Sequence, residues 1–433
     1  MASVPASQSR NRALREAEAG GALGKGNGGE AEFRSTLAAT RVEEQQHCRL
    51  SPCRSIELPV EVWWKVIDCV ADRLSVCQDG RRRMRELARV SRAWYTRCRV
   101  RAEERLDVIY RHKKEVYRLI RRLNEHPERY NAIKRVHFMN NKINNFGSLA
   151  VHMAGKLPHV ETLEPNFPWR HRDWEPGQLH PQVFLHVRVA FESATTLRLA
   201  RLTFPSAVVF GRLLCALPRL TSLTCGHVKF TNPGGVPGPV PSSLRLATVD
   251  LDSSDDVIGF LVETRAGAFL SHVVVRRSGD LEACSRLVAV AALSLSSFQF
   301  RINWFDRDDL LPDLTPAQNL CALSVCINPF SLNPKWLKRA LPDASLPNLR
   351  DFEIAVDLSA DDQQLSNDDF DDISYARIDG VLSGPLFPAL RKITLCLRCN
   401  VFPNRVTSIT SEVSWPAYIS LKLPLLHASG RLL

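Results

Sequence analysis

Two cysteines and one run of carboxylates have spacings that could support metal chemistry. Cys396 and Cys399 stand in CLRC, which is the spacing of half a zinc site or of a redox-active pair. A structural zinc ion takes four ligands, and the next cysteine upstream is Cys326. Residues 360–374, ADDQQLSNDDFDDIS, hold the carboxylates of a calcium loop without its turn glycine or terminal glutamate in place. We therefore expect no metal site and no cofactor.

The sequence also lacks the common motifs of catalysis. It contains no Gly-x-Ser-x-Gly, no His-Glu-x-x-His and no glycine-rich dinucleotide turn. We expect a protein without catalytic residues. Its function should then come from binding surfaces, and these depend on how the chain folds.

The positive charge is concentrated in one part of the chain. The net charge is +11, and residues 56–143 hold 22 Lys and Arg against 12 Asp and Glu. This block also contains rings on which bases could stack, at Tyr95, Tyr110, Tyr117 and Tyr130. Nucleic-acid binding through the block is therefore an open alternative, although no reader motif accompanies it and a charged helix face is usually only solvated.

The composition also predicts the cellular location of the protein and the state of its N-terminal segment. No stretch reaches the ~18 consecutive apolar residues of a membrane span. The N-terminus has no apolar segment of a secretory signal, so we expect a cytoplasmic or nuclear protein with reduced thiols and no membrane partner. Residues 1–55 carry too little apolar surface to offset the entropy of ordering, and we expect them to be disordered.

The segment IELPVEVWWKVIDCV, residues 56–70, predicts the first helix. Pro59 suits the first helical position because its φ is already helical, and Glu61 places a negative charge in the first turn. Helical periodicity predicts one apolar face made of Val62, Trp63, Val66, Ile67 and Val70. Trp64 lies off this face, so the helix carries an aromatic side chain that its own packing does not need.

Two further helical patterns follow a polar break. The first spans residues 84–95, and its predicted face consists of Met84, Leu87, Ala88, Ser91, Trp94 and Tyr95. The second is basic and amphipathic, in LDVIYRHKKEVYRLIRRLN at residues 106–124. Its predicted face consists of Leu106, Ile109, Tyr110, Val116, Leu119, Ile120 and Leu123.

The second half of the chain repeats a short pattern. A proline followed by spaced apolar residues recurs in KLPHVETLEPN, ALPRLTSLTCG, SLPNLRDFEIAV and LFPALRKITLCL. Each unit predicts a helix or irregular segment and then a short strand, and only stacked units can bury their apolar faces. We predict parallel strands in one sheet at residues 160–163, 220–224, 349–355 and 390–397. The pattern resembles an irregular leucine-rich repeat without the asparagine ladder of that family.

The order of residues in the first helices resembles the F-box, a short three-helix module. The matching residues are Leu58-Pro59-x-Glu61-Val62, Ile67, and Leu87-x-x-Val90-Ser91-Arg92-x-Trp94. The following segment, KKEVYRLIRRLNEHPERYNAIKRVHF, is similar to the part that joins F-box and repeats in many fungal F-box proteins. It also suggests a basidiomycete-type lineage.

The F-box resemblance implies a binding role. Such proteins are substrate-recognition subunits of SCF-type cullin-RING ubiquitin ligases, which bind an adaptor subunit, and through it a cullin, with the F-box and a protein substrate with the downstream domain. The resemblance assigns adaptor contacts to Leu58, Pro59, Val62, Trp64, Leu87 and Val90. It assigns the core of the module to Ile67 and Trp94. A repeat scaffold without a ligase role is the other alternative.

Together these expectations give an α+β or α/β chain, in which a small helical module precedes an irregular solenoid of parallel strands. The expected parts are a disordered tail at 1–55, an F-box-like module at 56–100, a basic linker helix at 101–130 and a leucine-rich-repeat-like substrate-binding domain at 131–433.

Overall fold

The structure of the chain is a computed structural model. It describes residues 58–74, 80–109, 112–139, 143–166, 182–232, 244–302, 311–327, 346–358, 375–399 and 414–432. The predictions for residues 1–55 and 360–374 lie outside these ranges. The chain forms two compact units, Met1–Trp63 and Trp64–Leu433, and this division falls inside the module expected at 56–100.

The first unit contributes the start of one helix. Helix α2 covers Val60–Leu74 and begins directly after Pro59, one residue later than predicted. The Pro59 carbonyl oxygen accepts hydrogen bonds from the N–H groups of Val62 at 3.0 Å and Trp63 at 3.3 Å. The helix start leaves the apolar side chains of Leu58, Val60 and Val62 exposed.

Eleven parallel strands of the second unit form one sheet, in the order β1-β2-β3-β4-β6-β8-β9-β10-β11-β12-β13. They are β1 (Arg105–Val108), β2 (Arg135–Met139), β3 (Thr162–Asn166), β4 (Thr196–Ala200), β6 (Ser222–Gly226), β8 (Thr248–Asp252), β9 (His272–Arg277), β10 (Ser297–Arg301), β11 (Ala322–Ile327), β12 (Asp351–Leu358) and β13 (Lys392–Cys399). Two shorter strands, β5 (Thr203–Ser206) and β7 (Lys229–Asn232), form a separate parallel pair.

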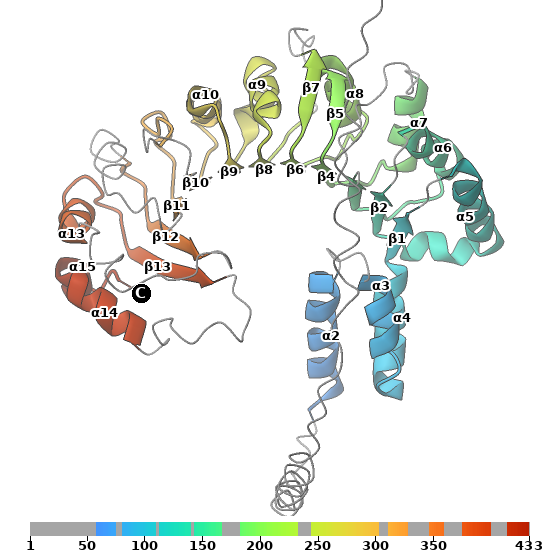
Figure 1. Ribbon diagram of the computed structural model, residues 1–433, viewed down its shortest axis with the longest axis horizontal. Coiled ribbons are helices and arrows are strands. Elements are labelled where there is room, and N and C mark those ends of the chain that lie inside the picture. The colour runs from blue at the N-terminus through green and yellow to red at the C-terminus, as the bar shows by residue number, and fades with distance from the viewer. Residues whose placement is uncertain are drawn as a thin grey trace, which may run out of the picture. The chain divides into compact units, whose positions relative to one another are not determined.

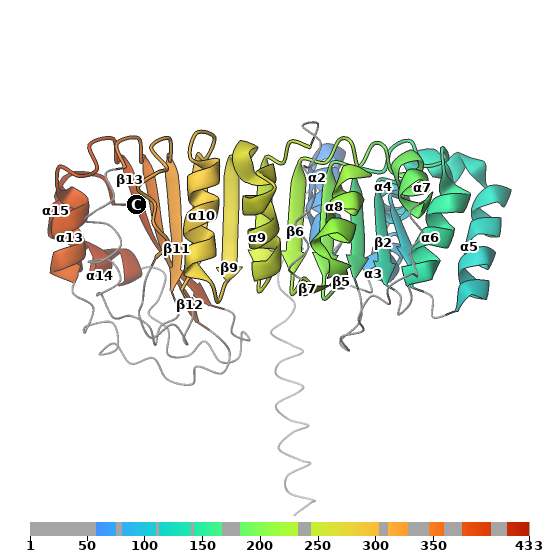
Figure 2. The same ribbon diagram turned by 90° about the horizontal axis from the view of Figure 1, so that it is seen from above.

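Helices cover one face of this sheet. They are α5 (Lys113–Glu125), α6 (Ile143–Met153), α7 (Gln182–Ala190), α8 (Ala207–Cys215), α9 (Asp255–Glu263), α10 (Leu281–Ala291), α13 (Tyr375–Ser383), α14 (Ser414–Lys422) and α15 (Pro424–Ala428), with short 3₁₀ turns at Pro127–Ala132 and Ala266–Phe269. Figure 1 shows the strands along the inner side of an arc and α6 to α10 on its outer side, and Figure 2 shows the strands running side by side. One apolar cluster fills the space between strands and helices.

The predicted strands are confirmed as parallel members of one sheet, and each begins two residues later than predicted. The residues after each repeat proline form a tight turn first. The N–H of Leu220 donates to Leu217 O at 3.1 Å, and the N–H of Leu349 donates to Leu346 O at 3.2 Å. These leucines are buried at the turn, and the strand starts after them.

A backbone ladder connects the turns of successive units where the asparagine ladder is missing. Thr221 and Ser222 both donate their N–H groups to Thr195 O, at 2.9 and 3.0 Å, and the same pattern recurs before the other strands. Side chains add further bonds between units, from Ser193 to Val160 O, Ser294 to Leu270 O, Asn319 to Leu293 O and Asn348 to Gln318 O. Serine and mixed amide side chains therefore take the place of a regular asparagine.

Three helices lie at the start of the second unit, namely the remainder of α2, α3 (Gly80–Leu87) and α4 (Arg92–Glu103). They have a small core of their own, formed by Ile67, Ala71, Met84, Ala88, Cys98 and Ala102. The predicted α2 face was wrong in part, because Ile67 and Ala71 turn inward while Val66 is exposed. A buried stripe that includes an alanine leaves larger apolar side chains of α2 at the surface.

The helix predicted over residues 84–95 is two helices. Helix α3 ends at Leu87, and Ser91 opens α4, where its hydroxyl oxygen accepts a hydrogen bond from the Trp94 N–H at 3.2 Å. A serine at this position satisfies a backbone donor that has no partner in the first helical turn. Tyr95 consequently lies on the exposed side of α4.

The linker helix expected at 101–130 was wrong in its first part. Residues Arg105–Val108 form strand β1, and helix α5 begins only at Lys113. Leu106 and Val108 alternate with charged residues at period two, and they are buried in the parallel pairing with β2. The sheet therefore begins before residue 131.

Candidate interaction surfaces

The sheet face away from the helices carries polar and charged side chains. Successive strand residues point to opposite faces, so burial of one set leaves the other set at the surface. Across β1 to β8 the central positions of this second set are Asp107, His137, Glu164, Arg198, Thr224 and Asp250. The sheet thus has one apolar side and one charged side.

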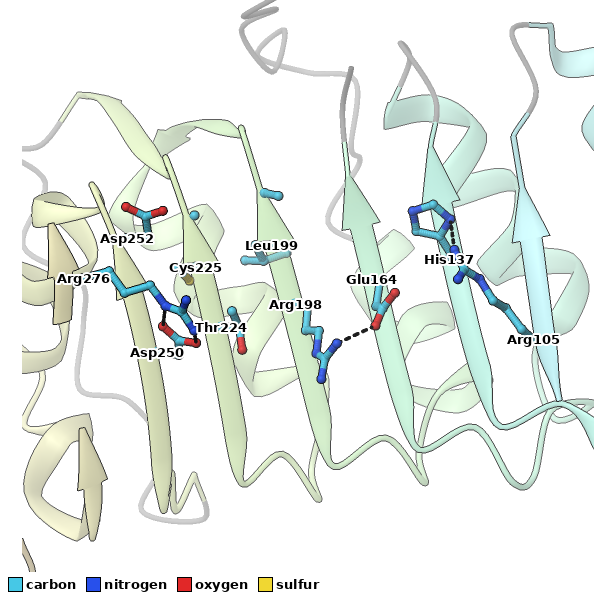
Figure 3. A pocket seen from close by; sticks show the side chains of 12 residues that line it. Arg105, His137, Glu164, Arg198, Leu199, Thr224, Cys225, Asp250, Asp252 and Arg276 are labelled. Carbon is cyan, nitrogen blue, oxygen red and sulfur yellow. Dashed lines mark hydrogen bonds and ion pairs between the residues drawn. The ribbon is translucent and has the colours of Figure 1, made fainter. Parts of the chain in front are cut away.

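A hollow of about 320 Å³ lies on the charged side (Figure 3). Its charged lining consists of Arg105, Glu164, Arg198, Asp250, Asp252 and Arg276. Ala200 at the end of β4 and Gly226 at the end of β6 also line it. A Cβ atom on Gly226 would have no other atom within 4 Å. The hollow forms because two neighbouring strands end without a large side chain.

Arginines cover carboxylates in this hollow. Arg198 donates from Nη1 to Glu164 Oε1 at 3.2 Å, and Arg276 makes two hydrogen bonds of 2.9 Å to the Asp250 carboxylate (Figure 3). The two arginine side chains are 47% and 56% exposed, whereas their acidic partners are 16% and 24% exposed. The surface therefore presents guanidinium groups, and each is held in place by a carboxylate.

Two further carboxylates of the charged side are ionised through the neutral range: Asp252, which lines the hollow, and Asp107 of β1, which contacts the lining residues Arg105 and His137. Burial raises the pKa of Asp252, but hydrogen bonds from Arg277 at 2.7 and 2.9 Å outweigh burial and lower that pKa. Burial also raises the pKa of Asp107, and the hydrogen bond with His137 and the charge of Arg105 lower it overall. The ion pairs of the charged side are therefore in place at neutral pH.

The strands at the hollow end in left-handed turns. Arg201, His227 and Ser253 follow β4, β6 and β8, with φ of 58°, 55° and 50°. Each N–H group donates to a carbonyl oxygen of the next strand at 2.7 Å, in the pairs Arg201 to Gly226, His227 to Asp252 and Ser253 to Arg277. This conformation is costly for a residue other than glycine. The repeated cross-strand bond holds it in three consecutive units and fixes the rim of the hollow.

The residues assigned to adaptor binding lie at the surface, with one exception. The exposed ones are Leu58, Pro59, Val62, Trp64 and Val90. Trp64 is 43% exposed and Val90 is 63% exposed. Leu87 is instead partly buried against the small helical core.

The two residues assigned to the core of the module lie together. Ile67 is 1% exposed, and Trp94 is partly buried against the same cluster, as Leu87 is. Truncation of Trp94 should therefore leave a smaller cavity than its full size indicates. Ile67 is the better residue for testing this core.

An arginine links two of the helices beside Trp64. Arg97 of α4 donates from Nε to Asp68 Oδ1 at 2.8 Å, and its guanidinium carbon lies 6.0 Å from the centroid of the Trp64 ring. The hydrogen bond from Arg97 lowers the pKa of Asp68. This pair fixes α4 against α2 and holds a cation over the ring of the exposed tryptophan.

Sequence reasoning missed the hollow, although the sequence carried a signal for it. When units are aligned on the first buried strand residue, the next position is Glu164 in β3, Arg198 in β4 and Asp250 in β8. Opposite charges at one aligned position of successive strands predict ion pairs across the sheet. The small residues Ala200 and Gly226 share a second aligned position, which predicts a gap.

The sequence predicts no metal site and no membrane partner. Among the residues that the structure describes, no group of three or more His, Cys, Asp and Glu could hold a metal ion. Cys396 and Cys399 both belong to β13. In the same ranges of the chain, no helix is both long enough and apolar enough to span a membrane.

Comparison with known proteins gives structural similarity at low sequence identity. No known family and no curated protein matches this chain. Among solved structures, the chain is similar to one described as "Crystal structure of TLR13-ssRNA13 complex", with 17% sequence identity and a TM-score of 0.31. The alignment covers 64% of this chain and 41% of that chain, so this chain spans less than half the length of that protein. The assignment of a parallel α/β solenoid therefore rests on strand order and register in this chain.

Proposed function

We propose that this chain is the substrate-recognition subunit of an SCF-type cullin-RING ubiquitin ligase. Its helical module binds the adaptor, and through the adaptor the cullin, while its sheet binds a protein substrate. The chain supplies no reacting group, because such a subunit acts by raising the local concentration of a substrate lysine near a ubiquitin-charged enzyme. The proposed location is the cytoplasm or the nucleus.

The observation that carries this proposal is the exposure of large apolar residues at F-box-like positions. In the first unit Leu58 and Val62 are exposed. In the second unit Trp64 and Val90 are exposed, and the core beneath the helices consists mainly of small side chains. Burying one such residue would contribute roughly 1.5–3 kcal/mol. Several large apolar residues exposed on a small module are typical of a protein-binding surface.

An adaptor pull-down tests the proposal. Changing Leu58→Ala together with Pro59→Ala should leave the fold nearly intact, because both residues are exposed. Adaptor binding should fall about thirtyfold, since removing an interface anchor commonly costs ~2 kcal/mol or more. The matched control is Val151→Ala, an exposed apolar residue of α6, which should bind the adaptor like the wild type.

The outcomes separate the proposal from its alternatives. A folded double variant that still binds like the wild type refutes the assigned contacts. A wild-type chain that binds no adaptor refutes the ligase role and leaves the repeat scaffold.

The ion pairs within residues 56–143 argue against nucleic-acid binding by this block. Many of its cations already have acidic partners, in the pairs Arg82–Glu86, Arg97–Asp68, Arg101–Asp72, Lys134–Glu104 and Arg135–Asp72. Measuring affinity at increasing salt concentrations distinguishes nucleic-acid binding from adaptor binding. Affinity for nucleic acid falls steeply with salt, whereas adaptor binding through apolar contacts should change little.

A further inference from the structure

We infer that the hollow on the charged side of the sheet binds an extended acidic segment of a protein partner. Two carboxylates of the segment lie on Arg198 and Arg276, and a small side chain between them lies over β6, where Thr224 is level with Arg198 and Gly226 ends the strand. This inference rests on the proposed role of the sheet in substrate binding, and it names the chemistry of that substrate.

The exposed charge of the hollow favours an anionic ligand. The carboxylates of Glu164 and Asp250 are mostly covered, and the arginines above them are about half exposed. Arg198 uses Nη1 for Glu164, and Arg276 uses Nε and Nη2 for Asp250, so each guanidinium has further N–H groups that can donate. The acidic partners hold the planar groups in position before a ligand arrives.

The spacing of the arginines fits an extended peptide that crosses the strands. Arg198 lies on β4 and Arg276 on β9, with β6 and β8 between them. Three steps between neighbouring strands span about 14 Å. Four residues of an extended peptide span about the same distance, and residues i, i+2 and i+4 point to the same side. An acidic residue at i and another at i+4 would therefore meet the two arginines, with residue i+2 over the hollow.

The lining argues against a nucleic acid in this place. Single-stranded nucleic acids bind in grooves that combine cations with aromatic rings for stacking. Among the residues that line the hollow, the only ring is the imidazole of His137, which is buried. Carboxylates beneath the arginines also reduce the long-range attraction for a polyanion, whereas two isolated carboxylates need only local contacts.

The test measures binding of a labelled peptide to the full-length chain at low salt. The probe contains Glu-Thr-Val-Thr-Glu between glycines, with blocked ends. A peptide with Gln in place of both Glu should bind about tenfold more weakly. The permuted peptide Thr-Glu-Glu-Val-Thr has the same composition and charge but places its acids on opposite sides, and it should bind about threefold more weakly.

Paired variants locate the site on the chain. Arg198→Gln and Arg276→Gln should each weaken the probe about threefold. Arg398→Gln is the matched control, because Arg398 pairs with Glu353 on the same sheet outside the hollow. Gly226→Trp fills the hollow and should weaken binding about tenfold, whereas Gly259→Trp, at a helical glycine whose Cβ would also meet no atom within 4 Å, should not. A thermal melt of each variant confirms that it is folded.

The readouts decide the inference without an adaptor. Preference for the acidic probe that is lost in Arg198→Gln, Arg276→Gln and Gly226→Trp, but kept in both controls, supports it. Equal binding of the acidic and neutral peptides overturns it, as does unchanged binding in Gly226→Trp. A single-stranded oligonucleotide that binds more tightly than the probe, and is lost in the same variants, also overturns it. Because the chain is tested alone, failure of adaptor binding is a separate result.

Discussion

The helical module and the sheet expose opposite chemistry. Around its small core the module leaves Trp64, Val66 and Val90 at the surface. The sheet buries its apolar side chains in one cluster that extends from Leu106 to Leu426, and it exposes arginine–carboxylate pairs. An apolar surface binds with little dependence on salt, whereas a charged surface is screened. The chain can therefore hold two partners by different forces.

The two regions also differ in what stabilises them. In the sheet each turn is hydrogen-bonded to the turn before it, so each unit is stabilised by its neighbour. The module has only a small core, and charged contacts lie around it. Asp72 pairs with Arg101 at 2.6 Å and with Arg135 of β2 at 3.0 Å, and Glu104 pairs with Lys134 at 3.0 Å. We expect the sheet to unfold cooperatively and the module to respond separately.

The largest expected effect is in the core of the sheet. Phe260 of α9 is buried, and its ring lies 5.0 Å from that of Phe210 in an edge-to-face arrangement. Phe260→Ala should lower the free energy of unfolding by ~3–5 kcal/mol through the lost contacts and the cavity. Urea unfolding measures the loss, and hydrogen exchange should rise in neighbouring units as well as in α9. Faster exchange in α9 alone would contradict a cooperative sheet.

A smaller loss is expected in the core of the module. Ile67→Ala should lower stability by ~2–4 kcal/mol, because Ile67 is buried among small residues that cannot fill the gap. Hydrogen exchange should rise in α2, α3 and α4 and stay unchanged in β6 to β10. If hydrogen exchange rises to the same extent in the central strands, the module and the sheet unfold as one cooperative body. That result would contradict separate unfolding of the two regions.

The fold of the repeats could be predicted from the sequence, but the position of β1 could not. The repeated units predict parallel strands because the same pattern recurs at the four predicted sites. An ambiguous reading of one unit can therefore be settled by comparison with the others. Arg105–Val108 has no such copy. Its alternation is only four residues long, and adjacent Ile109 also fits a helical face. Pairing with β2, which lies far along the chain, decides the conformation.

The two candidate surfaces also differ in how far the sequence predicts them. The order of residues assigned Leu58, Val62, Trp64 and Val90 to a binding surface, and all four are exposed. Helical periodicity placed Val62 on the apolar face instead. The hollow needs residues from seven strands, and its members have ordinary types for a strand surface. Only the register of neighbouring strands brings Arg198 beside Glu164, and register is not visible in any one segment.

An intermediate effect is expected from acid. Because its pKa is lowered in the folded chain, ionised Asp68 stabilises the module above its ordinary pKa of 3.8, and this contribution is lost as the pH falls through the lower folded value. Asp68→Asn should cost about 0.5–1 kcal/mol at pH 7, since both partners are partly exposed. Thermal melts should show that this difference shrinks near pH 3. A difference that stays constant with pH would assign the effect to packing instead.

The smallest expected effect concerns the exposed ion pairs of the sheet. Arg398 donates to Glu353 at 2.7 Å, and both side chains are more than a third solvent-exposed or close to it. Such pairs contribute roughly 0–1 kcal/mol, so Arg398→Gln and Arg276→Gln should both melt within about 0.5 kcal/mol of the wild type. Only Arg276→Gln should weaken the acidic probe. This result would separate recognition from stability, because two pairs of similar construction would differ in binding and not in folding. A large loss of stability in Arg276→Gln would instead make its ion pair part of the framework of the sheet, like the turns that bond unit to unit.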